Sequence, residues 1–268
     1  MKKLIVNADD FGFTHDVNAG IVEAHEKGIL TATTLMANGS AFEDAVRLAR
    51  EHPGLDMGVH LVLVGGSSLR TGLPLPQAIH ELIYAVVRGR IKPYDELKPQ
   101  VERIIEAGLQ PTHLDTHKHT HVIPAVLDAV ARLSQEYGIR WVRRPFDFPL
   151  SGGGYVPWTV RLLSRCMNGV RWRFHSALQR RDCRVTDHFA GFQMTGRFRV
   201  EELTALIRNL PEGITEFMCH PGRCTGELRG MRTRLKESRE EELKALIAPE
   251  VRHAIEEQGV QLARYRDL

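Results

Sequence analysis

The sequence predicts an α/β protein whose parallel strands form a (β/α) barrel, TIM-like but distorted. Short apolar runs alternate with amphipathic helical patterns along the chain, which is typical of βα units with right-handed crossovers. Eight such runs occur, the number of strands in a complete barrel. A doubly wound open sheet is the alternative fold for this order of elements.

The predicted strands are apolar runs of about four to eight residues. They cover residues 4–7, 29–36, 57–64, 112–116, 139–142, 184–189, 215–219 and 260–263. The clearest helices between them cover residues 16–27, 40–51, 95–107 and 122–137. We expect Gly28 to end the first helix in a left-handed conformation and Ser40 to cap the second.

The composition is that of a globular protein with one large core. The chain has 268 residues, of which 43% are hydrophobic and 26% are charged, so we expect residues 1–268 to form a single domain. A net charge of +3 predicts no general affinity for nucleic acid. The four cysteines lack CxxC spacing, and no signal peptide or membrane span is evident, so a reduced, cytoplasmic protein is expected. The oligomeric state stays open, and a homodimer is admitted.

Reactive side chains recur where the predicted strands end, which is the rim where parallel α/β barrels build active sites. They are Asp9, Asp10, His60, Asp115, His117, His119, His121, Arg143 and His220. Several separate elements therefore direct carboxylate, imidazole or guanidinium groups toward one rim.

Two adjacent aspartates end the first predicted strand. Free, partly buried carboxylates at Asp9 and Asp10 would repel, and the pKa of one would rise. A divalent cation bound by Asp10 removes this conflict and leaves Asp9 to take a proton from metal-bound water. The structural alternative is that Asp-Asp-Phe-Gly forms a turn, or that Asp10 caps the helix near Asp16.

The segment from Thr112 to His121 places a titratable residue at every second position, which would put them on one face of an extended chain. They are His113, Asp115, His117, His119 and His121. Burial of five such groups without a cation or a hydrogen-bond network is unfavourable, which favours a metal or catalytic site. A histidine-rich surface segment is the alternative. Taken alone, His60 would be an ordinary hydrogen-bonded histidine and His220 would stabilise a turn.

Two further segments stand out. Residues 65–94 contain several glycines and prolines and one predicted helix, 76–88, and we expect a binding loop there. Residues Tyr155–Arg181 contain six arginines and no acidic residue, interleaved with apolar residues including Trp158 and Trp172. Such a basic amphipathic segment is typical of a helix that contacts a membrane surface. A surface barrel helix whose arginine stems pack over the core is the alternative.

Short motifs occur in order between residue 1 and residue 225. They are Asn-Ala-Asp-Asp-Phe-Gly (7–12), Thr-Thr-Leu-Met (33–36) with Asn38-Gly39, Gly-Val-His-Leu (58–61), His-Leu-Asp-Thr-His-Lys-His (113–119) and Cys-His-Pro-Gly (219–222). In combination they resemble the YdjC-like family, which includes chitin-oligosaccharide deacetylases and the hopanoid-biosynthesis-associated HpnK proteins. Residues 63–109 and 149–184 carry no matching motif.

The resemblance implies a barrel related to polysaccharide deacetylases and one divalent ion. Magnesium or zinc is expected, and nickel or cobalt is admitted. The implied ligands are Asp10, His60 and His117.

The resemblance also implies catalytic roles. Asp9 is the implied general base and His220 the candidate acid for the leaving amine. Arg143 matches the arginine after the fifth strand, although Arg144 beside it is an alternative. We expect Asp115 or His119 to orient His117 as a hydrogen-bond partner.

The predicted function is therefore metal-dependent removal of an acetyl group from an N-acetylated amino sugar. The sugar would belong to a chitooligosaccharide or to an N-acetylglucosaminyl lipid such as a hopanoid, with peripheral membrane contact in the second case. The alternatives are a metal-dependent glycosidase or phosphoesterase, or a non-catalytic metal- or sugar-binding protein. A phosphoesterase would favour two metals and more aspartates, and a glycosidase would need two separated carboxylates.

Overall fold

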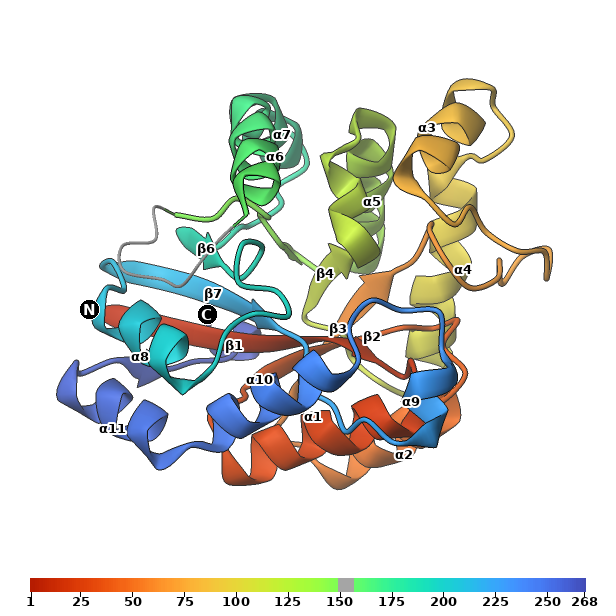
Figure 1. Ribbon diagram of the computed structural model, residues 1–268. Helices are drawn as coiled ribbons and strands as arrows, with labels where there is room; N and C mark the ends of the chain where they lie inside the picture. The colour runs from red at the N-terminus through yellow and green to blue at the C-terminus, as the bar shows by residue number, and fades with distance from the viewer. Residues whose placement is uncertain (149–156) are drawn as a thin grey trace.

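The computed structural model describes residues 1–148 and 157–268, and its centre is a curled sheet of parallel strands (Figure 1). The strands are β1 (Lys2–Phe11), β2 (Ala32–Leu35), β3 (Asp56–Leu61), β4 (His113–Thr116), β5 (Trp141–Val142), β6 (His188–Ala190), β7 (Gly213–Cys219) and β8 (Gln261–Leu262). Their order in the sheet is β5-β4-β3-β2-β1-β7-β6, and β8 pairs with the start of β1 at Lys3 and Leu4.

The two ends of this strand order are joined by isolated bridges instead of a full ladder. Trp141 bridges to Arg184 and Asp147 bridges to Phe189, both in parallel orientation. These contacts link the β5 side of the sheet to the β6 side, so the sheet curls back on itself. The predicted distorted barrel is confirmed. β5 and β6 are only two and three residues long, which leaves the closure without a regular ladder.

Helices follow the strands and cover the sheet (Figure 1). They are α1 (His15–Lys27), α2 (Phe42–Glu51), α3 (Ile79–Val87), α4 (Pro93–Glu106), α5 (Pro124–Tyr137), α6 (Trp158–Gly169), α7 (Arg171–Gln179), α8 (Val200–Arg208), α9 (Gly226–Gly230), α10 (Glu237–Ile247) and α11 (Pro249–Glu257), with 3₁₀ turns at His117–Val122 and Tyr265–Asp267. The core between sheet and helices is apolar, with Val6, Val59 and Leu114 of the strands fully buried. Among the described residues, no helix has the length and apolar character required to cross a bilayer.

Gly28 ends α1 as predicted, but the left-handed conformation expected for it and the predicted Ser40 cap are wrong. Gly28 has a φ of −116°, outside the left-handed region. A glycine is needed there for space, because a Cβ would lie 2.4 Å from the carbonyl oxygen of Leu246. Ser40 does not cap α2, because its hydroxyl donates instead to the carbonyl of Phe13, at 2.7 Å. Thr14 caps α1 by accepting the Val17 N–H.

The basic segment forms two helices instead of one. α6 and α7 meet at Val170, and Tyr155 and Val156 at the predicted start of the segment lie outside the described residues. In Figure 1 these helices project from the upper part of the molecule, beside α5. All four cysteines are free, and Cys166 on α6 is the exposed one.

Helix α1 packs closely against the turn that follows β7. A Cβ built on Gly20 would lie 2.3 Å from the Cα of Gly222. We expect Gly20→Ala to lower the free energy of unfolding by about 1–3 kcal/mol, as overpacked cores do, in urea denaturation. Gly169→Ala is the matched control, because nothing lies within 4 Å of a Cβ at that helical position. Equal stability of the two variants would contradict this packing.

Candidate functional site

The backbone at the end of β1 brings two neighbouring aspartates to the same place. Successive strand residues normally face opposite sides of a sheet. Here the register between β1 and β2 shifts between Ala8 and Phe11, and Asp10 takes a φ of 70°. This bulge lets both Asp9 and Asp10 reach the site. The predicted turn exists too, because the Phe13 N–H donates to the Asp10 carbonyl at 3.0 Å.

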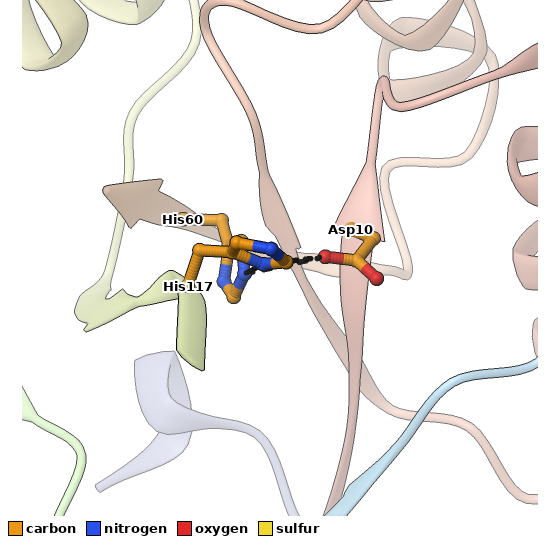
Figure 2. Close-up of side chains that lie close together, drawn as sticks. All are labelled: Asp10, His60 and His117. Carbon is orange, nitrogen blue, oxygen red and sulfur yellow. Dashed lines mark hydrogen bonds and ion pairs between the residues drawn. The ribbon is translucent and has the colours of Figure 1, made fainter. Parts of the chain in front are cut away.

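Asp10, His60 and His117 converge from three elements, as Figure 2 shows. Asp10 Oδ1 lies 3.3 Å from His60 Nε2 and 3.2 Å from His117 Nδ1. The two imidazole nitrogens are 3.2 Å apart. His60 is the fifth residue of β3, and His117 directly follows β4.

This cluster fits a divalent ion. Asp10 Oδ1 is buried without a hydrogen-bond partner among the described residues. Ligand atoms bound to one ion at about 2.0–2.2 Å lie roughly 3 Å or slightly more from one another, as these three do. One carboxylate oxygen and two imidazole nitrogens also form a donor set that suits zinc and other divalent metals.

A carboxylate behind His60 fixes the orientation of its ring. His60 Nδ1 lies 2.7 Å from Asp115 Oδ1, and Thr34 donates to Asp115 Oδ2 at 3.1 Å. With Nδ1 protonated toward Asp115, the Nε2 lone pair faces Asp10 and His117. Burial lowers the pKa of His60, but Asp115 and Asp10 outweigh it and raise the pKa to about 10. The position therefore favours positive charge, which a metal would supply in place of the proton.

The predicted alternation of the histidine segment ends at Thr116, because β4 is only four residues long. Lys118 and His119 then take left-handed conformations with φ of 54° and 52°. As a result, Asp115 and His117 reach the site. The expectation that they share one face with the other three histidines is wrong.

Three histidines of this segment, His113, His119 and His121, contact residues outside the Asp10–His60–His117 cluster. His113 Nε2 donates to Asn7 Oδ1 at 2.9 Å, and the His113 ring stacks on Tyr265. His121 lies between the Thr116 hydroxyl and the Arg143 carbonyl. His119 packs against Phe189 and Phe192. The expectation that Asp115 or His119 orients His117 is therefore wrong: Asp115 orients His60.

A buried arginine connects the acidic residues behind the cluster. Arg143 Nη1 and Nη2 donate to the two oxygens of Asp9 at 2.8 and 2.7 Å. Its guanidinium also lies 2.6 Å from both Asp115 and Glu216. Arg144 instead donates to backbone carbonyls, including that of Asp187. Of the two arginines, Arg143 is therefore the one that contacts the acidic residues behind the cluster.

Arginine side chains prevent the rise in pKa that two free, partly buried aspartates would show. Burial alone would raise the pKa of Asp9, but the Arg143 guanidinium outweighs it and holds that pKa well below its usual range. Burial likewise opposes ionisation of Asp10, and Arg239 holds its pKa well below normal. Each carboxylate has its own arginine, so their mutual repulsion is compensated.

Sequence reasoning missed two site residues on α10. The buried Arg239 donates to Asp10 Oδ2, which leaves Oδ1 facing the two histidines. Glu242 accepts the backbone N–H of His220 at 2.5 Å and that of Gly196 at 2.7 Å. Burial raises the pKa of Glu242 to about 7.

A signal for these residues is present in the sequence. Arg239 and Glu242 share an i, i+3, i+4, i+7 stripe with Leu243 and Leu246, the pattern of a helix face turned toward a core. Charged residues on such a stripe are buried only when they form ion pairs or hydrogen bonds with other buried groups. Glu216 carries a similar signal, an acid within the otherwise largely apolar β7.

His220 is a further histidine close to Asp9. Its Nε2 is 3.8 Å from Asp9 Oδ2, and its Nδ1 is buried without a partner among the described residues. Burial lowers the pKa of His220 to about 4, so its ring is neutral at pH 7. Cys219 faces away, with its thiol toward the Asn7 carbonyl.

Fold and site together define an α/β barrel protein with an Asp-His-His cluster at the carboxyl ends of its strands. The model of the YdjC-like protein family matches residues 3–257, so the chain belongs to the YdjC-like family. A carbohydrate deacetylase of Brevibacillus brevis is 34% identical over 99% of both chains. One of Geobacillus stearothermophilus is also 34% identical, over 98% of this chain and 96% of its own.

A solved structure supports the same fold. A protein of Enterococcus faecalis described as a cellobiose-phosphate cleavage protein is 26% identical to this chain. It superposes with a TM-score of 0.76, and the match covers 99% of this chain and 98% of that one.

The cluster geometry predicts one tightly bound divalent ion per chain. Asp10→Asn, His60→Gln and His117→Gln should each weaken binding by more than about 100-fold, because losing a ligand exceeds the effect of losing an outer partner. Isothermal titration calorimetry with zinc and magnesium measures this. His119→Gln is the control and should bind like the original protein, because His119 packs against phenylalanines. Equal losses in all four variants would contradict the assignment of ligands.

The Arg239 contact predicts a second effect on metal binding. Arg239→Gln should weaken metal affinity by about 10–100-fold, because Asp10 loses the partner that holds its orientation. Arg239→Lys should recover part of this loss by keeping the charge. Lys244→Gln, on the exposed side of the same helix, controls for helix stability. If metal titration finds Arg239→Gln unchanged, Arg239 does not position the ligand.

Proposed function

We propose that this protein is a metal-dependent hydrolase that removes the acetyl group from an N-acetylated amino sugar. The observation that carries the proposal is the Asp10, His60 and His117 cluster with a separate carboxylate, Asp9, beside it. The two carbohydrate deacetylases among the relatives supply the substrate class.

The ion would be held by Asp10, His60 and His117. A divalent ion held there would supply the charge that polarises an acetyl carbonyl and lowers the pKa of a water molecule. Magnesium and zinc are the main candidates, with nickel and cobalt as further ones. Asp115 keeps the His60 ring in place through its 2.7 Å contact.

Asp9 acts as the general base in this proposal. Ligand-type atoms of Asp9, His60 and Asp115 lie within 4.8 Å of one another, so Asp9 borders the metal cluster. Arg143 holds both Asp9 oxygens and keeps the carboxylate ionised, which preserves a proton acceptor at neutral pH. Its contact also fixes the direction in which Asp9 faces the attacking water.

His220 protonates the leaving amine in this proposal. Because burial keeps His220 neutral, it must acquire a proton during the reaction before it donates one. Asp9 is a ready source, since its Oδ2 lies 3.8 Å from His220 Nε2. The Glu242 contact to the His220 backbone N–H holds the backbone of this residue in place.

The other enzyme classes fit the geometry less well. Asp9, His60 and Asp115 form a second cluster of potential ligands, but the Arg143 guanidinium already pairs with both of its carboxylates. This arrangement opposes the second metal ion that a two-metal phosphoesterase requires. A glycosidase acid requires a raised pKa, whereas Asp9 and Asp10 both have lowered ones. A non-catalytic protein would have no use for an aligned Asp9 and His220.

The two catalytic roles predict different responses to the leaving group. Asp9→Asn should slow acetate release from N-acetylchitooligosaccharides by about 10²–10⁴-fold while metal binding is retained. It should slow hydrolysis of 4-nitrophenyl acetate as well, because the base acts on water. His220→Gln should slow amide hydrolysis but spare much of the ester reaction, because 4-nitrophenolate departs without a proton.

Asp128→Asn, at an exposed position on α5, serves as the matched control and should leave both rates unchanged. Equal losses of amide and ester hydrolysis in His220→Gln would remove its role as acid. Full activity in Asp9→Asn would remove the base. An acetate-release screen over soluble chitooligosaccharides and N-acetylglucosaminyl lipids, with each metal, distinguishes the two proposed substrate classes.

A further inference from the structure

We propose that the α6–α7 hairpin, residues 158–179, docks onto an anionic lipid bilayer. The proposal concerns a surface that contains none of the Asp-His-His cluster residues, and it goes beyond hydrolysis. It rests on the distribution of apolar and basic side chains on these two helices.

Helix α6 turns an apolar stripe toward solvent. Its buried side is made by Ser164 and Met167. Trp158 and Leu162, one helical turn apart, lie on the opposite side and are 71% and 52% exposed. Leu163, the next residue along the chain, is also 52% exposed. A helix of a globular protein normally hides such a stripe, so its exposure indicates a binding surface.

Helix α7 continues the same surface chemistry. Trp172, near its start, is 77% exposed, and Phe174 and Leu178 anchor the helix to the core. Tryptophan is the side chain that settles best between headgroups and acyl chains, because its ring is apolar and its N–H is polar. Both helices thus present a tryptophan outward.

Every formally charged side chain of residues 157–181 is basic. The exposed arginines of the hairpin are Arg161, Arg165, Arg171 and Arg173. Residues 157–181 include no acidic residue, and none of these four arginines forms an ion pair within the described part of the chain. Unpaired arginines beside exposed tryptophan and leucine match an anionic bilayer, which offers phosphates above an apolar interior.

A second helix repeats the pattern on the same side of the molecule. α3 exposes Ile79, Ile83 and Val87, spaced four residues apart, with Arg88 and Arg90 after them. In Figure 1, α3 and the α6–α7 hairpin stand at the upper side of the view, on either side of α5.

Both insertions leave the sheet from the carboxyl ends of strands. α3 follows β3 and α6 follows β5, and the carboxyl ends of β1, β3 and β4 in the same sheet carry Asp10, His60 and His117. Docking through these insertions therefore brings the rim with the metal cluster to the membrane side. A sugar carried on a lipid would then meet the site, a consequence that rests on the proposed function.

Vesicle flotation tests the docking. The full chain should float with vesicles of phosphatidylcholine and phosphatidylglycerol, and not with phosphatidylcholine alone. The variant with Arg161, Arg165, Arg171 and Arg173 changed to Glu should bind more than about tenfold more weakly, because each basic residue near an anionic surface contributes to binding. The matched variant changes Arg50, Arg208, Lys244 and Arg252 to Glu, which gives the same net charge, and it should float like the original protein.

Tryptophan fluorescence adds a local measurement. The emission should shift to shorter wavelength on the anionic vesicles, and the shift should vanish in Trp158→Phe, Trp172→Phe, where Trp141 against Tyr265 is the remaining tryptophan. Acetate release from a soluble chitooligosaccharide, if present in the original protein, should be unchanged in every variant. The proposal is overturned by absent flotation on anionic vesicles, by equal flotation of both arginine variants, or by light scattering that finds a dimer whose interface protects Trp158 and Trp172.

Discussion

The site depends on the burial of two guanidinium groups against two adjacent carboxylates. Arg143 grips both oxygens of Asp9, and Arg239 holds one oxygen of Asp10. Without them, neighbouring buried aspartates would repel and one would take up a proton. Breaking such a buried pair costs about 3–5 kcal/mol, because the partner charge is left uncompensated. The same contacts decide which oxygens remain available, since Asp10 offers only Oδ1 to the two histidines.

Residues far apart in the sequence share the work of holding this arrangement. Asp10 ends the first strand, whereas Arg239 lies on α10 near the end of the chain. The same helix holds the turn after β7, because Glu242 accepts the His220 N–H and the Arg239 carbonyl accepts the Gly222 N–H at 3.2 Å. Helix α10 thus fixes the metal cluster and His220 relative to each other, and loosening it would disturb both.

The barrel, its strand count and the gathering of reactive side chains at one rim could be predicted from the sequence, because strand ends and polar residues are local signals. The choice of Asp10, His60 and His117 among those side chains came from the resemblance to the YdjC-like family. What could not be predicted depends on backbone detail. The left-handed conformations at Lys118 and His119 turn the chain after β4 and break an alternation that the sequence alone implies. Helix caps failed for a related reason: the environments of Gly28 and Ser40 are set by distant segments. Arg239 could not be assigned to the site because its partner, Asp10, lies far away in the sequence and is brought beside it only by the fold.

The positive φ of Asp10 limits which amino acids this position tolerates. A backbone at φ of 70° is accessible to glycine, asparagine and aspartate, and strains most longer or branched side chains. Glutamate would keep the charge yet would strain the bulge and displace the carboxylate. The backbone conformation at this position therefore restricts which acidic residue can serve as the ligand. If a mutation replaced Asp10, glutamate would not restore the site.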